Sequence, residues 1–213
     1  MLITLNDKLR RRVYIFSCEE TGDTAVIDPF RDIKSIMSEI KKNNLNVKYI
    51  FNTHYHADHT YSNKRLKQLT GAEILIHTND AGLLRQKINL MKIFLNKYRR
   101  SPVPDIIIEK DCDFILGKRK LKLIHTPGHT KGGICIYDIK ENILFTGDTL
   151  FTHRHGRTDF KYGSKEEMLK SYDKIMNTFR DDTVIYPGHS YGDRHTITLG
   201  EIKADREYLP LSR

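Results

Sequence analysis

The sequence predicts an α/β protein in which two β-sheets pack together and helices cover their outer faces. Two stretches of short β-prone runs occur along the 213 residues, and helical segments follow each stretch. The composition, with 38% hydrophobic and 30% charged residues, is typical of a folded globular chain. Because no linker or low-complexity segment interrupts it, we expect residues 1–213 to form a single domain.

The first half of the chain predicts one sheet with helices packed on it. β-Branched and aromatic residues bounded by turn residues predict strands at 1–5, 13–18, 24–28, 47–51 and 73–77. Apolar residues at helical spacing predict helices over 32–42 and 60–70. A longer helix is predicted over 81–100, where it either covers the core or forms a lid beside a pocket.

The second half repeats this order of elements. Short apolar runs joined by polar turns predict strands at 113–116, 121–125, 133–138, 142–146 and 183–186. Helical spacing of apolar residues predicts helices over 165–179 and 195–208. The two halves together give the two sheets and their outer helices.

Charge, hydropathy and cysteine content limit the partners and the compartment. The formal charge of +9 is dispersed over the chain, which is typical of a solvated surface rather than a nucleic-acid interface. No apolar run approaches the roughly 18 residues of a membrane span, and the first residues turn basic too early for a signal peptide. Cys18, Cys112 and Cys135 form no Cys-x-x-Cys pair, so we expect reduced core thiols. We therefore expect a cytoplasmic protein that binds neither nucleic acid nor membranes.

The segment Thr53-His-Tyr-His-Ala-Asp-His59, directly after a predicted strand, is the most informative part of the sequence. Side chains of an extended chain alternate, so His54 and His56 project to the same side, while Asp58 and His59 can reach a second position. Neutral imidazoles suit zinc and iron, and a carboxylate supplies the negative charge that a divalent cation requires. The segment therefore predicts a metal centre.

Three later segments repeat the same local arrangement, a hydrophobic strand followed by a glycine-containing turn with a polar side chain. TPGH offers His129, TGD offers Asp148 and PGH offers His189. Glycine beside each candidate ligand lets the backbone turn sharply and approach the site. We expect four strand ends to bring their ligands to one rim of the molecule.

The pattern His54-x-His56-x-Asp58-His59, followed in order by His129, Asp148 and His189, resembles the metallo-β-lactamase superfamily over nearly the whole chain. The resemblance implies an αββα sandwich, with two mixed sheets packed face to face and a metal site at one edge. It also implies two divalent metal ions, zinc or alternatively iron or manganese. It divides the ligands into His54, His56 and His129 for the first ion, Asp58, His59 and His189 for the second, and Asp148 for both.

Within the superfamily, the segments TPGHT, FTGDTLF and GRTDF resemble the glyoxalase II (hydroxyacylglutathione hydrolase) branch. This resemblance implies hydrolysis of a thioester by a metal-bridging hydroxide, with Asp58 and Asp148 as catalytic residues. It further implies that Arg157 and Tyr191 contact the substrate. The alternative for Arg157 is an internal ion pair with Asp159.

The chain departs from glyoxalase II proper after its last candidate ligand. Only the 24 residues 190–213 follow His189, so we expect no separate C-terminal glutathione-binding helical domain. The chain resembles the short glyoxalase II-like forms, whose expected substrate is S-(2-hydroxyacyl)glutathione or a related small anionic thioester. The short forms also resemble persulfide dioxygenases, which use a single iron. The presence of Asp58, His59 and His189 favours the binuclear hydrolase, and the oligomeric state is not predicted.

Overall fold

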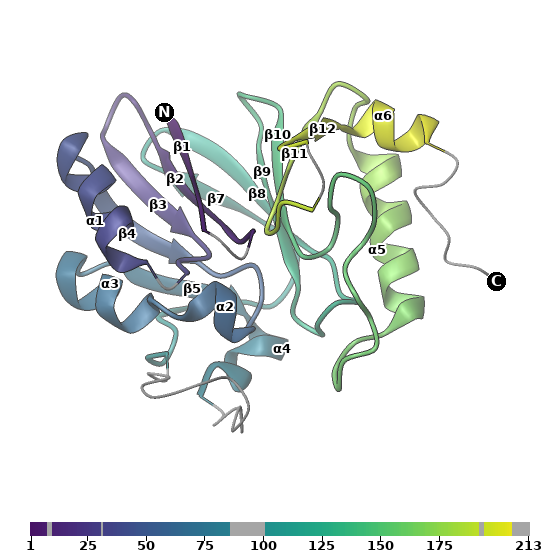
Figure 1. Cartoon of the computed structure of the whole chain (residues 1–213), viewed down its shortest axis with the longest axis horizontal. Helices are drawn as coiled ribbons and strands as arrows, with labels where there is room; N and C mark the ends of the chain where they lie inside the picture. Colours follow the sequence, from purple (N-terminus) through teal and green to yellow (C-terminus); the bar gives the residue numbers. More distant parts are fainter. Residues whose placement is uncertain (8–9, 31, 86–100, 192–193, 206–213) are drawn as a thin grey trace.

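The computed structural model describes residues 1–7, 10–30, 32–85, 101–191 and 194–205. Two six-stranded sheets packed face to face form its centre (Figure 1). The strands of the first sheet, in spatial order, are β1 (Leu2–Asn6), β2 (Arg12–Ser17), β3 (Asp23–Ile27), β4 (Asn46–Phe51), β5 (Glu73–His77) and β6 (Ile106–Ile108). Those of the second are β12 (Ile197–Thr198), β11 (Val184–Pro187), β10 (Ile143–Gly147), β9 (Ile134–Asp138), β8 (Arg119–His125) and β7 (Cys112–Leu116).

Both sheets are mixed, as the sequence predicts. In the first sheet β1, β2 and β3 pair antiparallel, whereas β3 to β6 run parallel. In the second sheet β10 and β11 are parallel and all other pairs are antiparallel. Parallel strands β3, β4 and β5 end at one edge, and so do β10 and β11, because each parallel pair shares its direction.

Apolar side chains of both sheets form one buried layer between them. Phe16 and Phe51 of the first sheet belong to the same core cluster as Leu123 and Phe145 of the second. The rings of Phe16 and Phe145 meet edge to face at 5.4 Å between centroids. Side chains alternate along a strand, so the remaining apolar residues of each sheet face outward and require helices to cover them.

Helices cover the outer face of each sheet (Figure 1). α1 (Ile33–Lys42) and α3 (Asn63–Thr70) pack on the first sheet, where Ile36 and Leu66 join Ile50 in a buried cluster. α5 (Lys165–Thr178) and α6 (Leu199–Ala204) pack on the second sheet, where Ile175 contacts the cluster around Leu144. The molecule is therefore an αββα sandwich, which confirms the predicted fold class.

The helix predicted over 60–70 begins at Asn63 in the structure, and a separate short helix, α2, precedes it. α2 (Ala57–Thr60) ends at Thr60, and α3 begins after Ser62. The Ser62 backbone N–H donates to the Pro29 carbonyl at 3.0 Å, and its hydroxyl donates to the Phe30 carbonyl at 2.5 Å. These bonds to the loop after β3 divert the chain from a continuous helix. The break separates the ligand-bearing turn from the covering helix.

The helix predicted over 195–208 begins later than expected. Residues Ile197–Thr198 pair with β11 as the edge strand β12, and Thr198 then caps α6. The Thr198 hydroxyl accepts the Glu201 N–H, and the Glu201 carboxylate accepts the Thr198 N–H, which is a capping box. The cap fixes the start of the helix at Leu199, and residues 206–208 lie outside the described part.

The region predicted as a long helix over 81–100 is described only at its start. α4 (Thr78–Ala81) is followed by a 3₁₀ turn, η1 (Leu83–Arg85), and residues 86–100 lie outside the described residues, so the lid remains a prediction. The three-residue strand β6 was not predicted from the sequence.

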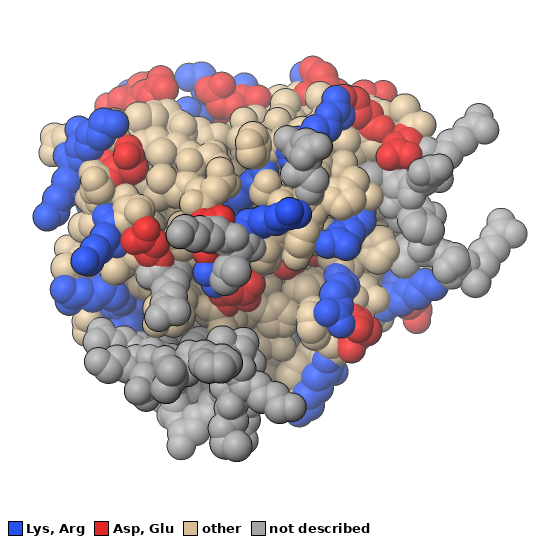
Figure 2. All heavy atoms as spheres, in the orientation of Figure 1, with Lys and Arg blue, Asp and Glu red and all other residues tan. Residues whose placement is uncertain are grey.

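Lys and Arg side chains are dispersed among Asp and Glu on the visible face (Figure 2). Within the described residues, no helix has the length and apolarity needed to cross a membrane.

Candidate metal centre

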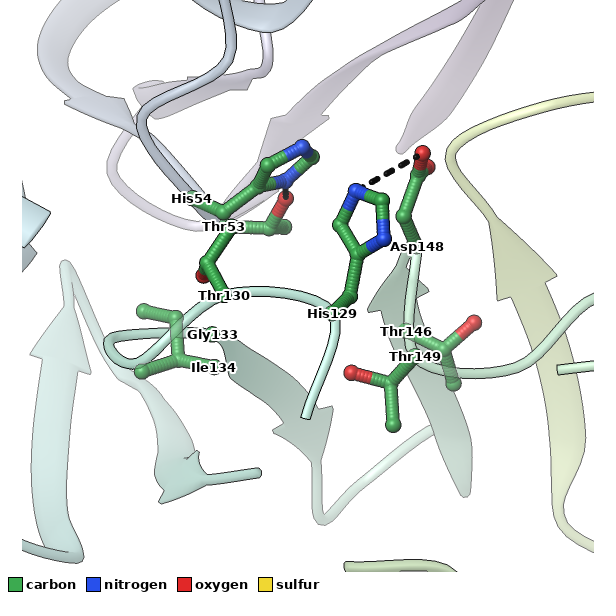
Figure 3. A pocket seen from close by; sticks show the side chains of 9 residues that line it. All are labelled: Thr53, His54, His129, Thr130, Gly133, Ile134, Thr146, Asp148 and Thr149. Atoms are coloured by element: carbon green, nitrogen blue, oxygen red, sulfur yellow. Dashed lines mark hydrogen bonds and ion pairs between the residues drawn. The ribbon is translucent and has the colours of Figure 1, made fainter. Parts of the chain in front are cut away.

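The seven predicted ligands lie together at one edge of the sandwich. The turn after β4 carries His54 and His56, and α2 carries Asp58 and His59. The remaining three are His129 between β8 and β9, Asp148 directly after β10 and His189 after β11. The view into the pocket at this edge shows the His54, His129 and Asp148 side chains around one space (Figure 3). Four strand ends therefore deliver their polar side chains to one rim, as expected.

Three histidines form the first ligand group, with their ring nitrogens directed at one another. His54 Nε2 lies 3.1 Å from His56 Nδ1, and His129 Nε2 lies 3.0 Å from the same atom. His54 and His129 are buried, and His56 is half-buried. Such close approach of three imidazole nitrogens is the arrangement expected of ligands that share one cation.

Asp58, His59 and His189 form the second ligand group. Asp58 Oδ2 lies 3.3 Å from His189 Nε2 and 3.9 Å from His59 Nε2. His59 is 2% exposed, and its Nε2 has no hydrogen-bond partner among the described residues. A buried nitrogen without a partner is costly, and a cation at this position would satisfy it. The donor set of this group therefore fits a divalent metal.

Asp148 lies between the two groups. Its Oδ2 is 3.6 Å from His129 Nε2 in the first group. Its Oδ1 is 3.5 Å from His59 Nε2 and 2.8 Å from His189 Nδ1 in the second group. Oδ2 thus faces the first group and Oδ1 faces the second. A carboxylate that bridges two cations requires this position.

Hydrogen bonds behind the first group fix which ring nitrogen faces the site. The His129 Nδ1–H donates to the Arg157 carbonyl at 2.7 Å. The Thr53 hydroxyl donates to Asp28 at 2.6 Å, so its oxygen is left to accept the His54 Nδ1–H at 3.0 Å. Both histidines therefore present the lone pair of Nε2 toward the centre.

Asp28 is a site residue that sequence reasoning missed. Its Oδ2 lies 2.9 Å from His59 Nδ1, and its Oδ1 accepts the Thr53 N–H at 2.8 Å. The side chain is buried, and the backbone has φ +51°, which is uncommon for a residue other than glycine. Its one signal in the sequence is a carboxylate at the end of a buried strand on the same edge as the ligands. Asp28 therefore orients the His59 ring through Nδ1, which leaves Nε2 directed toward Asp58 and Asp148.

Asp80, in α4, is a second residue that sequence reasoning missed. Its carboxylate accepts the Tyr55 N–H at 3.1 Å, the Thr130 hydroxyl at 2.8 Å and the Gly132 N–H at 2.8 Å. It therefore ties the turn that carries His56 to the loop that carries His129. Burial raises the pKa of Asp80, and these three donors oppose that rise.

Glycine is required at two of the turns because side chains come close there. A Cβ on Gly147, which has φ +50°, would lie 2.4 Å from the Thr53 hydroxyl oxygen. A Cβ on Gly188 would lie 2.6 Å from Asp148 Oδ1. Both distances are too short for non-bonded atoms, so the glycines of the TGD and PGH segments allow the ligand turns to close on one another.

The two ligand groups differ in electrostatics. In the first group, burial holds the pKa of His54 well below its usual value and lowers that of His56 to about 4. In the second group, burial also acts to lower the pKa of His189, but Asp148 and Asp58 offset it and raise the value to about 9. The pKa of His59 is raised well above its usual value by Asp148, Asp28 and Asp58 in the same way.

Arg157 and Tyr191, the predicted substrate contacts, flank the two groups on different sides. The Arg157 guanidinium is 69% exposed and pairs with Asp159, with Nη2 2.6 Å from Oδ2, which is the alternative that the sequence left open. Tyr191 stacks on His189 of the second group, with ring centroids 5.5 Å apart. Phe160 packs edge to face against His56 and His129 at 5.4 and 5.5 Å.

Known proteins resemble this chain in sequence and in fold. A hydroxyacylglutathione hydrolase of Maricaulis maris is 35% identical over 193 residues, which cover 89% of this chain and 66% of that relative. The crystal structure of the BLEG-1 B3 metallo-beta-lactamase has a TM-score of 0.87 at 22% identity and covers 96% of this chain and 97% of that chain. The structure of TTHA1623 in a di-iron-bound form has a TM-score of 0.83 at 22% identity and covers 98% of both chains.

The sequence profile of one protein family spans most of the chain. The profile of the metallo-beta-lactamase superfamily matches residues 11–189, a range that begins in the first sheet and ends at the last residue of the second ligand group. The range includes all seven residues gathered at the rim and the strands β2 to β11. On this match, and on a fold shared with solved members, the chain belongs to the metallo-beta-lactamase superfamily.

Proposed function

We propose that this chain is a binuclear metal-dependent hydrolase that cleaves S-(2-hydroxyacyl)glutathione or a related small acidic thioester. The observation that carries the proposal is the position of Asp148, with one carboxylate oxygen 3.6 Å from His129 and the other 3.5 Å from His59. A carboxylate placed between two donor groups suits a pair of cations rather than a single ion. Relatives named hydroxyacylglutathione hydrolase, at 30–35% identity, support the choice of a thioester.

The donors divide between two proposed cation positions. The ligand atoms within each group lie within 4.8 Å of one another. The proposed ligands are His54, His56 and His129 for the first position, Asp58, His59 and His189 for the second, and Asp148 for both. All donor atoms are nitrogen or oxygen, which suits zinc, with iron and manganese as the alternatives. A protein of the same fold has been described in a di-iron-bound form.

Bound cations would supply a water of lowered pKa and would polarise the thioester carbonyl. The chain's own contribution is to position the reactants. Asp58, which is 40% exposed, faces the open side of the second group and can accept a hydrogen bond from the attacking water. Its pKa is lowered by His59 and His189 against the effect of burial, so the carboxylate is ionised at neutral pH. Asp148 holds the two groups at a fixed separation.

The protein's thiols do not serve as nucleophiles in this proposal. Against the effect of burial, hydrogen bonds from Thr21 and Lys118 lower the pKa of Cys18 to about 7, but this thiol lies beside the β7–β8 turn, at the opposite end of the sheet from the ligand rim. Cys135 is buried, and Cys112 packs against the core between the sheets. Burial raises the pKa of Cys135 to about 11, which disfavours the thiolate form that nucleophilic attack requires. The attacking group is therefore proposed to be water, held by Asp58.

Two side chains are proposed to contact the substrate, one beside each ligand group. Arg157 lies above the Phe160 ring, 4.6 Å from its centroid, next to the first group. Tyr191 lies against His189 of the second group, and the Arg154 guanidinium covers its ring at 4.1 Å. The proposed partner is a small anionic thioester, and the proposed setting is the cytoplasm.

The test combines metal analysis with two assays on the same purified protein. Protein loaded with zinc, manganese or iron is assayed for S-lactoylglutathione hydrolysis, and oxygen uptake is followed with glutathione persulfide. We expect two metal ions per chain and thioester cleavage without oxygen consumption. One iron per chain, iron-dependent oxygen uptake and no thioester cleavage with any of the three metals would overturn the proposal in favour of the persulfide dioxygenase.

A further inference from the structure

A cleft of about 320 Å³ lies beside the first ligand group. It is bounded by the loop between β8 and β9, by the segment before α5 and by α4, and its polar lining includes Asn79, His125, Lys131, Lys161, Tyr162 and Glu167. Thr130, which follows His129, lines both this cleft and the small pocket at the ligand rim. The cleft therefore adjoins the proposed metal centre without being part of it.

Two lysines and one glutamate in the lining give the cleft a net positive charge. Lys131 Nζ lies 5.9 Å and Lys161 Nζ lies 5.2 Å from the centroid of the Tyr162 ring. Within the described residues, neither ammonium has a carboxylate oxygen within 4 Å. Glu167, the acidic residue of the lining, lies 3.3 Å from Lys170 on its own helix, and Lys170 also pairs with Glu166 at 2.8 Å. Two cations beside one aromatic ring are arranged to meet an anion.

The backbone that carries Lys131 is held from several sides. The Lys131 carbonyl accepts the His125 Nε2–H at 2.9 Å and the Asn79 side-chain N–H at 3.3 Å. Asp80 holds the residues on both sides of Lys131 through the Thr130 hydroxyl and the Gly132 N–H. The loop thus presents the Lys131 side chain from a fixed position, which reduces the entropic cost of holding a ligand there.

Aromatic rings connect the cleft to the first ligand group. The Tyr162 ring centroid lies 6.3 Å from that of Tyr55, which in turn lies 4.7 Å from that of His56. A thioester with its carbonyl at the ligand rim could extend one arm along these rings into the cleft. The charged end of that arm would then lie between the two lysines.

We infer that this cleft binds the acidic end of the substrate's thiol, with Lys131 and Lys161 as specificity-determining residues; the inference rests on the proposed thioesterase function. A 2-hydroxyacyl group carries no charge of its own, so an anion in the cleft belongs to the thiol arm. The arm ends in a carboxylate if the thiol is a peptide and in a phosphate if it is a nucleotide. Both are anions that lysine ammonium groups bind well.

The first experiment compares the Lys131→Ala/Lys161→Ala double variant with the wild type on three lactoyl thioesters. Their thiols are glutathione, coenzyme A and the uncharged N-acetylcysteamine. Lys140→Ala is the matched control, because Lys140 is exposed on the β9–β10 turn, at the other end of these strands from the ligand rim. We expect the double variant to raise KM about tenfold for the charged thioester that the wild type prefers, with kcat and the uncharged substrate unaffected.

The second experiment measures binding without turnover. Metal-loaded wild type and double variant are titrated calorimetrically with S-methylglutathione and with S-methyl coenzyme A, whose blocked sulfur cannot ligate a metal as a thiolate. The preferred compound identifies the anion as carboxylate or phosphate, and the double variant should lose about tenfold in affinity for it. Circular dichroism and metal content equal to wild type would show that the variant is folded.

The outcomes separate the two proposals. If the wild type cleaves thioesters but the double variant binds and cleaves the charged ones as well as the wild type does, the inference on the cleft is wrong and the hydrolase stands. If the wild type cleaves no thioester, the proposed function is wrong. In that case, if the double variant binds S-methylglutathione and S-methyl coenzyme A as tightly as the wild type does, the cleft is not an anion site either.

Discussion

The two ligand groups sit side by side at one rim, but they differ in their charge. The first, His54, His56 and His129, consists of imidazoles whose pKa values are lowered by burial, so it is neutral at pH 7. The second contains Asp58, and its two histidines have raised pKa values because of the surrounding carboxylates. The first group can therefore accept a cation without losing protons, whereas the second must release protons to do so.

The difference in histidine pKa between the two groups arises from the carboxylates that surround the second group. Asp28 lies 2.9 Å from His59, and Asp148 lies 2.8 Å from His189, whereas the hydrogen-bond acceptors behind His54 and His129 are an uncharged hydroxyl and a carbonyl. Protons on the second group balance the negative charge until a cation replaces them. Among the seven candidate ligands, Asp148 is the one that directs a carboxylate oxygen toward each group, so it should be the residue on which both proposed cations depend.

Replacing Asp148 with Ala should have the largest effect. Loss of the carboxylate between the groups should reduce metal content to below one ion per chain and lower kcat on the order of a thousandfold, because each catalytic cation contributes several kcal/mol. Asp58→Ala and His189→Ala should cost less metal, because each removes a ligand of the second group alone. Elemental analysis and S-lactoylglutathione kinetics on the three variants provide the measurement. If the Asp148→Ala variant keeps full metal content and full turnover, Asp148 is not a ligand shared by two cations.

Replacing Asp28 with Asn should weaken the second group more than the first, because Asp28 contacts His59 directly and reaches His54 only through the Thr53 hydroxyl. The amide keeps an oxygen for the Thr53 N–H but loses the negative charge beside His59 Nδ1. Metal affinity at the second position should fall by about 10–100-fold, the usual cost of losing a partner behind a metal ligand. Competitive chelator titration should show a larger loss of affinity at the second site than at the first. Equal weakening of both sites would contradict the assignment of Asp28 to the second group.

The clustering of the seven candidate ligands at one rim was predictable from the sequence because each lies in a short segment directly after a buried strand. Asp28 and Asp80 were not, since their partners lie far away along the chain: 31 residues separate Asp28 from His59, and 50 separate Asp80 from Thr130. Such contacts depend on the packing of the sheets. The edge strands β6 and β12 escaped prediction because three and two residues are too few to show alternation.

The pH dependence of metal binding should distinguish the groups. The pKa of His189 is raised to about 9 in the metal-free protein, so at pH 7.5 the ring holds a proton that a cation must displace. Affinity at the second position should therefore rise with pH, by about tenfold per unit for each proton released, and the contribution of His189 to this rise should end above about pH 9. The pKa of His56 is about 4, so affinity at the first position should be nearly constant over the same range.

Calorimetry in buffers of different ionisation enthalpy measures these protons directly. The first equivalent of zinc and the second should differ in the number of protons released at pH 7.5. Asp28→Asn provides a control, because removing one carboxylate should lower the pKa of His59 and reduce the protons released by the second equivalent. Identical proton release by both equivalents in the wild type would show that the two groups do not differ as proposed.

Replacing Arg157 with Ala should have the smallest effect. This variant tests whether the exposed guanidinium beside the first group binds the substrate. Arg157 is an exposed residue whose ion pair with Asp159 is screened by water, so the pair holds the guanidinium only weakly. If the guanidinium leaves Asp159 for the substrate carboxylate, KM for S-lactoylglutathione should rise a few-fold with kcat unchanged, as expected for loss of uniform binding. Asp159→Ala should then lower KM, because it frees the guanidinium. Unchanged kinetics in both Arg157→Ala and Asp159→Ala, for every acidic thioester that the wild type cleaves, would assign Arg157 to its internal pair.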